Sequence, residues 1–337
     1  MGITAMLHSL ATPVDNNRYY YERLTGEQRR IYKSMYSGIK TFSEKIPMPL
    51  RPINELFKIF KYILLDHPLL FYTSSFSCQN DLYKKRCIVM PEYIYRRSWV
   101  KEKTNAALDN LRVFDAALGK SAWDKELYVH DYCLENFTYG FAPEDWSHTI
   151  LGPLLENTGV CEGISKFVKL ALDYLGVKTT VVAGKAKFPQ DYSVNDAHAW
   201  NIVDLEGKTY HLDVTFDMSL QGQVNRYDYF NLSDEDIKKD HAIIDGAPVC
   251  ATMGKDYYSV NKLIARRPAE IEKLIANSLK NGKKIIVAKL VDAEYSQKVV
   301  DKVFKIAQYQ YGAICKRKGT VAINYNEKQM VVEIYFT

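Results

Sequence analysis

The chain has 337 residues, of which 47% are hydrophobic and 25% charged, and its formal net charge is +5. These proportions are typical of a soluble globular protein that buries its core without disulfide or metal support. Basic and acidic residues are interspersed, so no dense basic stripe is visible, which argues against a nucleic-acid partner. No apolar stretch approaches about 18 residues, so we expect neither a transmembrane helix nor a membrane partner.

The cysteines argue against a disulfide framework or a metal centre. They are sparse for the length of the chain, and no CxxC or CxxH pair occurs. We therefore predict mostly buried free thiols, no metal and no organic cofactor. The N-terminal residues lack a charged region followed by a sustained apolar run, so a cytoplasmic protein is the simplest expectation, although a secreted form without its leader would look the same. The six cysteines are Cys78, Cys87, Cys133, Cys161, Cys250 and Cys315.

We predict that residues 1–121 form an N-terminal helical and α/β extension. Apolar residues from Ile31 to Phe42 recur at helical spacing and form one stripe. Thr25, followed three residues later by Gln28, has the pattern of a capping box at the start of this helix. The further elements predicted in this part are a helix over 53–65, strands over 69–73 and 87–95, and a helix over 99–118.

We predict that residues 122–245 form a second structural part of the chain. Residues 246–337 are expected to form a compact C-terminal α+β part. In the second part a helix begins at Cys161 and ends at Leu175, with Gly176 in the C′ position. The other elements predicted there are a helix over 123–137, an irregular connection over 138–158, and strands over 178–184, 197–205 and 208–215. In the C-terminal part we predict a strand from 257, helices over 268–281 and 293–310, and strands over 284–291, 320–326 and 330–336.

Cys161 is the first candidate catalytic residue. It lies in the stretch NTGVCEG (157–163), at the start of an amphipathic helix. A helix N terminus carries partial positive charge and unpaired N–H donors, which stabilise a thiolate and make a cysteine nucleophilic. Taken alone, a cysteine at such a position is more often structural.

His198 and Asp213 flank a predicted hairpin. Glu206-Gly207 between two strand-like segments indicates a two-residue loop, which would pair positions whose numbers sum to 413. Asp213 then lies opposite Trp200 and shares a face with His198, at a Cβ separation of roughly 7–8 Å. A three-residue loop would instead place the two side chains on opposite faces of the sheet.

Cysteine, histidine and aspartate together are the set that acyl transfer by a thiol requires. The thiolate attacks a carbonyl carbon, the imidazole protonates the leaving amine, and the carboxylate fixes the orientation and tautomer of the imidazole. The backbone N–H of Cys161 and one donor from the preceding loop are the expected ligands of the oxyanion.

Three motifs, in this order, resemble the transglutaminase-like superfamily: VCEG at 160–163, HAWN at 198–201 and YHLDVTFD at 210–217. The bacterial branch fits best, because HDY (130–132), SHT (147–149), GPL (152–154), YDYFNLSD (227–234) and DH (240–241) also match its pattern. The resemblance covers residues from about 127 to 241. Two departures, Ile164 in place of a common aromatic residue and the loop 187–195, leave the triad intact but bear on the substrate groove.

The resemblance implies an α+β fold with a papain-like core, in which a helix bearing the cysteine packs on an antiparallel sheet. It implies a catalytic triad of Cys161, His198 and Asp213 that acts on a protein or peptide substrate. Hydrolysis by a cysteine peptidase or amidase is slightly favoured, because water needs no second binding site. Transamidation of glutamine by an amine, and a non-catalytic binding module that retains the fold, are the alternatives.

Overall fold

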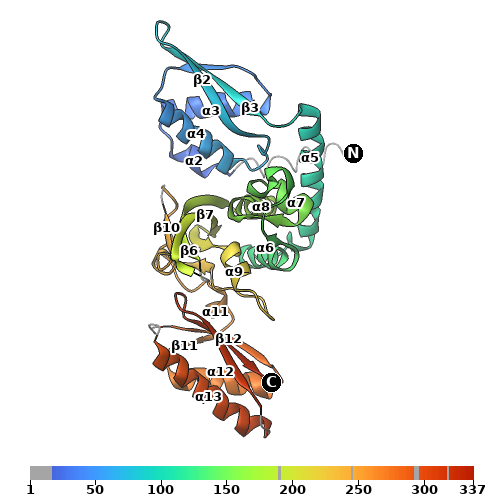
Figure 1. Cartoon of the computed structure of the whole chain (residues 1–337), viewed down its shortest axis with the longest axis vertical. Helices are drawn as coiled ribbons and strands as arrows, with labels where there is room; N and C mark the ends of the chain where they lie inside the picture. The colour runs from blue at the N-terminus through green and yellow to red at the C-terminus, as the bar shows by residue number, and fades with distance from the viewer. Residues whose placement is uncertain (1–16, 189–190, 244–245, 292–295, 317–318) are drawn as a thin grey trace. The chain divides into compact units, whose positions relative to one another are not determined.

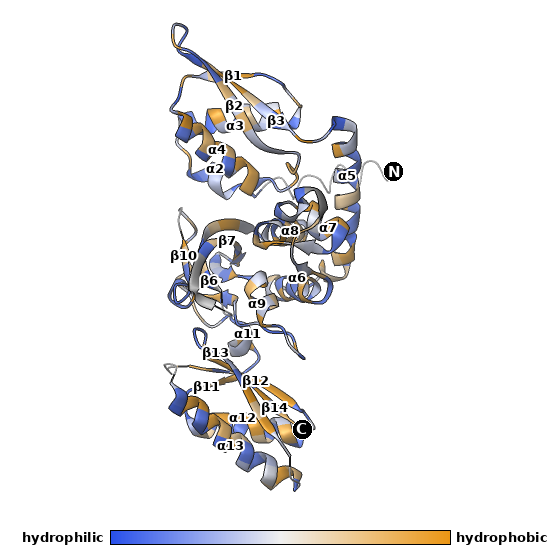
Figure 2. Cartoon of the chain, in the orientation of Figure 1, coloured by the Kyte–Doolittle hydropathy of each residue, from blue (hydrophilic) through white to orange (hydrophobic). Residues whose placement is uncertain are grey.

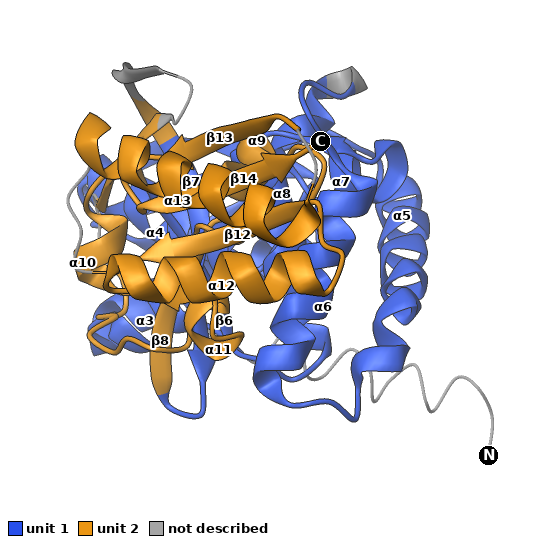
Figure 3. Ribbon diagram, turned by 90° about the horizontal axis from the view of Figure 1, so that it is seen from below, with its two compact units in different colours: residues 1–183, 198–207 blue, residues 184–197, 208–337 orange. Residues whose placement is uncertain are grey.

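Figure 1 shows the computed structural model, which describes all residues except 1–16, 189–190, 244–245, 292–295 and 317–318. The chain divides into two compact units (Figure 3). Unit 1 comprises Met1–Ala183 and His198–Gly207, and unit 2 comprises Gly184–Ala197 and Lys208–Thr337. The three-part division 1–121, 122–245 and 246–337 stays a prediction. Within the described ranges, no helix combines the length and apolarity needed to cross a bilayer.

The first part of unit 1 packs helices against a small antiparallel sheet. The predicted capping box is confirmed, because Thr25 accepts a hydrogen bond from the backbone N–H of Gln28 and the Gln28 side chain accepts one from that of Thr25. The helices are α2 (Tyr19–Arg23), α3 (Gly26–Lys40) and α4 (Ile53–Asp66), and the strand order is β1 (Ile46–Pro49), β3 (Arg86–Tyr93), β2 (Thr73–Asp81).

The strand predicted over 69–73 is wrong. Residues 69–72 form turns with an irregular residue at Leu70, and β2 begins only at Thr73. Leu70, Phe71 and Tyr72 are nevertheless buried. The apolar run therefore reports burial in the core, which a short hydrophobic segment achieves without strand pairing.

The rest of unit 1 is mainly helical. The predicted helix over 99–118 divides into an α-helix and a 3₁₀ segment, and α8 carries Cys161 at its first position with every residue from 163 to 173 buried. Gly176, with φ of +78°, follows the end of α8 as predicted. The elements are α5 (Arg97–Asn110), η1 (Leu111–Ala117), α6 (Ala122–Asn136), η2 (Pro143–His148), α7 (Leu151–Glu156) and α8 (Cys161–Tyr174), with the short parallel pair β4 (Thr138–Tyr139) and β5 (Thr158–Gly159).

A five-stranded sheet contains the segments that carry the histidine and lead to the aspartate. Its strand order is β10 (His241–Ile243), β6 (Thr179–Phe188), β7 (Asp191–Leu205), β8 (Lys208–Leu212), β9 (Phe230–Leu232). The division between the units passes through β6 and β7. Between β7 and β8 stand only Glu206 and Gly207, with φ of +58° and +82°. This confirms the predicted two-residue loop, since a tight hairpin of type I′ requires positive φ at both positions.

The predicted strand over 208–215 is too long. Strand β8 ends at Leu212, and Asp213 is the N-cap of helix α9 (Val214–Leu220). The Asp213 carboxylate accepts a hydrogen bond from the backbone N–H of Phe216 at 3.0 Å, which stabilises the first turn of α9. The capping bond therefore ends the strand at the residue before the candidate aspartate.

The C-terminal segment of unit 2 is an α+β arrangement with its own core. Its sheet has the order β11 (Ile264–Ala265), β12 (Ile285–Leu290), β14 (Val331–Phe336), β13 (Val321–Asn326), parallel only between β11 and β12. Helices α12 (Pro268–Lys280) and α13 (Gln297–Cys315) cover one face, and the apolar strands β12 and β14 stand out in Figure 2. The strand predicted from 257 is wrong, because α11 (Tyr257–Val260) forms there. Part of the helix predicted over 293–310 lies outside the described residues.

Candidate active site

Cys161 is the first residue of α8 and is partly exposed. The backbone N–H of Val160 donates to the carbonyl of Ser147 at 3.1 Å, so the end of η2 lies against the start of α8. A Cβ at position 163 would collide with that same carbonyl oxygen, which explains why glycine follows Cys161-Glu162. The packing leaves the cysteine at an accessible helix N terminus, where the backbone dipoles favour negative charge.

Glu162 forms a charged cluster directly beside Cys161. Its carboxylate lies 2.7 Å from the ammonium of Lys166 and 3.3 Å from Nδ1 of His148. Burial alone would raise the pKa of Glu162, but its interactions with Lys166 and His148 outweigh it and lower the pKa to about 2. The hydrogen bond to Glu162 in turn raises the pKa of His148. The residue next to the candidate nucleophile is therefore a carboxylate held ionised by Lys166 and by its hydrogen bond to His148.

Ser165 connects the start of α8 to the strand that carries His198. Its hydroxyl lies 2.7 Å from the carbonyl oxygen of Cys161 and 3.0 Å from that of Ala199, the residue after His198. The amide of Asn201 donates to the Ser165 carbonyl at 2.9 Å. All of these residues belong to unit 1, and these bonds hold β7 at the first turns of α8. The sequence analysis missed Ser165, whose only signal is its place one turn after the cysteine.

His198 is buried, with 3% of its surface exposed, and its ring stacks on Trp200 at a centroid distance of 5.9 Å and an interplanar angle of 17°. Trp200 is itself fully buried. Its indole is therefore fixed by packing and restricts the orientation of the His198 ring. Cys161 and His198 thus come from neighbouring elements of one unit.

Asp213 belongs to unit 2, where three donors hold its carboxylate. Oδ1 accepts from the hydroxyl of Thr215 at 2.7 Å and from the N–H of Phe216, and Oδ2 lies 3.0 Å from Nε2 of His241. The other ring nitrogen of His241 lies 2.6 Å from Asp240. Burial alone would lower the pKa of His241, but the bonds to the two carboxylates outweigh it and raise the pKa.

These contacts show what sequence reasoning about the triad left out. The pair Asp240-His241 entered the sequence analysis only as a family signature, without a role. In the structure His241 is a direct partner of the candidate aspartate from 28 positions along the chain. A triad of Cys161, His198 and Asp213 would draw on both units, so it is a proposal.

Three potential metal ligands lie together in unit 2. His211, Asp234 and Cys250 have ligand atoms within 4.8 Å of one another. Nε2 of His211 lies 2.9 Å from Asp234, whose other oxygen accepts the backbone N–H of Cys250 at 3.2 Å. Burial lowers the pKa of His211 to about 4 and raises the pKa of Cys250 to about 12, so a neutral imidazole and a thiol are expected at pH 7. The hydrogen bonds of Asp234 to His211 and Cys250 account for the proximity of these three residues, although zinc prefers the same residue types.

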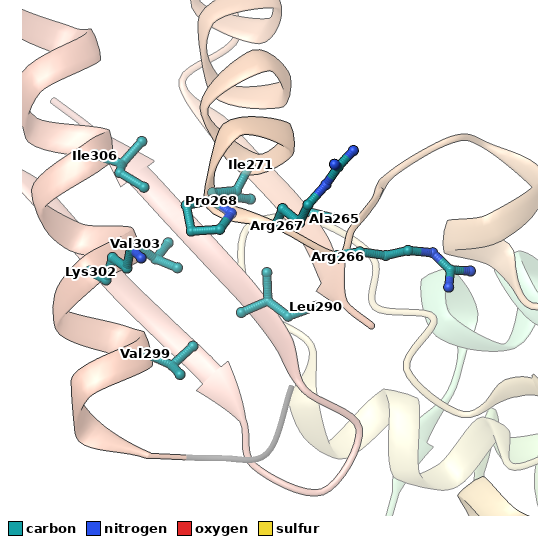
Figure 4. Close-up of a pocket in the computed structure, with 10 residues that line it drawn as sticks. All are labelled: Ala265, Arg266, Arg267, Pro268, Ile271, Leu290, Val299, Lys302, Val303 and Ile306. Carbon is teal, nitrogen blue, oxygen red and sulfur yellow. The ribbon is translucent and has the colours of Figure 1, made fainter. Parts of the chain in front are cut away.

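A cavity of about 190 Å³ lies in the C-terminal segment of unit 2. Figure 4 shows apolar side chains from α12, β12 and α13 facing one another across it, while the guanidinium groups of Arg266 and Arg267 point away. Its lining contains no cysteine, histidine or carboxylate among the described residues. The cavity therefore offers no groups for acyl transfer.

No protein-family model matches the chain, and no curated protein gives a significant match. Among solved structures, a TGase (transglutaminase) is 17% identical over 47% of this chain and 48% of its own, with a TM-score of 0.29. A candidate cysteine protease from Cytophaga hutchinsonii is 13% identical over 42% and 61%, with a TM-score of 0.28. A candidate protease from Parabacteroides distasonis is 13% identical over 42% and 36%, with a TM-score of 0.22.

The chain spans about half the length of the transglutaminase that it matches. These three solved structures are thus a transglutaminase, a candidate cysteine protease and a candidate protease. Their TM-scores lie below 0.5, so the likeness carries no argument about activity, substrate or partner.

Proposed function

We propose that the protein is a cysteine-nucleophile acyl-transfer enzyme whose catalytic triad is Cys161, His198 and Asp213. One observation carries the proposal: Ser165 bonds to the backbone of Cys161 and of Ala199, and so holds the start of α8 against the strand that bears His198. The cysteine is partly exposed at a helix N terminus and the histidine is oriented by its packing on Trp200. These are the conditions under which a thiol–imidazole pair acts on a carbonyl group.

The role of Asp213 is supported by the turn between β7 and β8. Glu206 and Gly207 make the predicted two-residue loop, and β8 ends at Leu212, so Asp213 follows directly after the strand that pairs with β7. Thr215, Phe216 and His241 together hold the Asp213 carboxylate in one orientation. A fixed, ionised carboxylate is what is needed to hold an imidazole in its productive tautomer.

The proposed reaction proceeds through a thioester. The thiolate of Cys161 attacks the carbonyl carbon of an amide, and the backbone N–H at the start of α8 donates to the oxyanion. The imidazolium of His198 then gives its proton to the leaving amine as the C–N bond breaks. In the second half of the reaction, water or an amine attacks the thioester while His198 takes a proton from this nucleophile. The C–S bond then breaks and releases the Cys161 thiolate.

Hydrolysis is slightly favoured over transamidation, because water needs no second binding site. Both outcomes share the same acyl-enzyme and differ only in the nucleophile that resolves it. A protein or peptide amide is the proposed substrate. A non-catalytic module that keeps this fold is the alternative from another class, and it predicts that Cys161 forms no acyl intermediate.

The decisive experiment is to incubate the protein with a glutamine-containing peptide, with and without a primary amine. Ammonia release and the peptide products are followed by mass spectrometry. Hydrolysis yields a deamidated or cleaved peptide in both samples, whereas transamidation yields an amine-linked peptide only when amine is present. Cys161→Ala should abolish every product, and Cys315→Ala, which removes another partly exposed thiol, should not. Products that persist in Cys161→Ala would contradict the proposal.

A further inference from the structure

A cavity in unit 1 lies between α3, the 67–72 segment and α5, and Cys161 is not among its lining residues. Its volume is about 360 Å³, within the range of sites that bind small molecules. Three cationic side chains line it: Lys40 at the end of α3, and Arg97 and Lys101 on α5. None of the described residues that line it carries a carboxylate. The cavity therefore has a positive potential without a built-in counter-charge.

Aromatic rings form the other part of the lining. Tyr36 stacks on His67 at a centroid distance of 4.1 Å, and Phe42 stacks on Tyr72 at 4.7 Å with an interplanar angle of only 9°. The ammonium of Lys40 lies 5.3 Å from the centroid of the Tyr36 ring and 3.1 Å from its hydroxyl. Aromatic side chains and cationic groups thus line the same space.

Phe42 is held in this lining at a conformational cost. Its φ of +61° is rare for a bulky side chain. The turn is held by Tyr93, whose ring packs on Phe42 at 4.8 Å and whose hydroxyl donates to the carbonyl of Ser43 at 2.9 Å. Strained residues of this kind persist where surrounding contacts over-determine them, and they cluster at ligand sites.

We propose that this cavity binds a small organic anion with a planar unsaturated ring. The ring would lie against the aromatic lining, and its carboxylate, sulfonate or phosphate would face Lys40, Arg97 and Lys101. Arg97 is the first residue of α5, so the partial positive charge of the helix N terminus lies beside one of the lining cations. The site is independent of the proposed acyl transfer, since it uses none of the triad residues.

The test uses anilinonaphthalene sulfonate, an anion with planar aromatic rings, beside neutral N-phenylnaphthylamine, which has the same rings without the charge. Dissociation constants and stoichiometry are measured by calorimetry and fluorescence on the full chain. In Lys40→Ala/Lys101→Ala the dissociation constant of the anion should rise about tenfold, because each exposed charge contributes a factor of roughly two to five. Binding of the neutral probe should be unchanged. Lys33→Ala/Lys120→Ala, an equal loss of charge on α3 and after η1, is the matched control.

Two further arms separate this cavity from general surface binding. Leu108→Trp places a large ring in the lining from α5 and should weaken both probes, with far-UV circular dichroism confirming the fold. Naphthoate and naphthyl phosphate are compared as competitors, and displacement by either identifies the preferred anion. The proposal is overturned if the two double variants bind the sulfonate equally, if Leu108→Trp leaves binding unchanged, or if neither competitor displaces the probe. Cys161→Ala should bind like the wild type, which keeps this test separate from that of the enzymatic activity.

Discussion

Selective alkylation of Cys161 is the most direct chemical consequence of the proposed mechanism. The three buried thiols are strongly disfavoured as thiolates: burial raises the pKa of Cys87 to about 11 and of Cys250 to about 12, and it raises that of Cys133 as well. At pH 7.5, thiolate fractions for pKa values of about 11 and 12 are roughly 3 × 10⁻⁴ and 3 × 10⁻⁵, against about 0.1 for a reference thiol with a pKa near 8.5. These buried cysteines should therefore react at least several hundredfold more slowly than an ordinary thiol.

The fair comparison is with Cys78 and Cys315, which are partly exposed like Cys161. Iodoacetamide is added to the native protein at pH 7.5, and labelled peptides are quantified over time by mass spectrometry. Cys161 should react at least about tenfold faster than both, because the α8 N terminus and His198 stabilise its thiolate. His198→Ala should remove most of this advantage without changing the other two rates. If Cys161 reacts no faster than Cys78 and Cys315 in the native protein, the nucleophile assignment fails.

Four further predictions address the surroundings of the site. Asp213→Asn should keep the fold, because asparagine also caps helices, but lower kcat by roughly 10³–10⁴; unchanged kcat would exclude the triad. Ser165→Ala should cost about 1–3 kcal/mol of unfolding free energy in urea and slow Cys161 alkylation; an unaltered alkylation rate would show that its bonds do not position the cysteine. The pKa of His211 is lowered by burial from 6.5 to about 4, so the unfolded chain binds more protons between these values. The unfolding free energy should thus fall as pH drops from 6.5 to 4, by about 3 kcal/mol, and His211→Gln should flatten that profile in chemical denaturation; an identical profile would contradict this. A chelator should leave the melting temperature and activity unchanged, and a loss that zinc or calcium restores would show a metal that the sequence analysis did not predict.

Local signals were read correctly from the sequence where their cause is local. The capping box of Thr25 and Gln28, the end of α8 before Gly176 and the loop at Glu206-Gly207 all depend on backbone conformations set by a few neighbouring residues. The same is true of the start of α8 at Cys161, where an amphipathic pattern begins. The candidate nucleophile could therefore be located on its element without any tertiary information.

Only tertiary packing decided the rest. Leu70, Phe71 and Tyr72 have the composition of a strand but fold as turns, because burial against other elements satisfies them equally well. Asp213 leaves the predicted strand since its carboxylate caps α9, and it meets His241 from 28 positions away. Ser165 bonds to Ala199 from 34 positions away, and the ring pairs around Phe42 also join distant segments. Such partners depend on which surfaces meet when the chain packs, and a linear pattern of hydrophobic and polar residues does not record that.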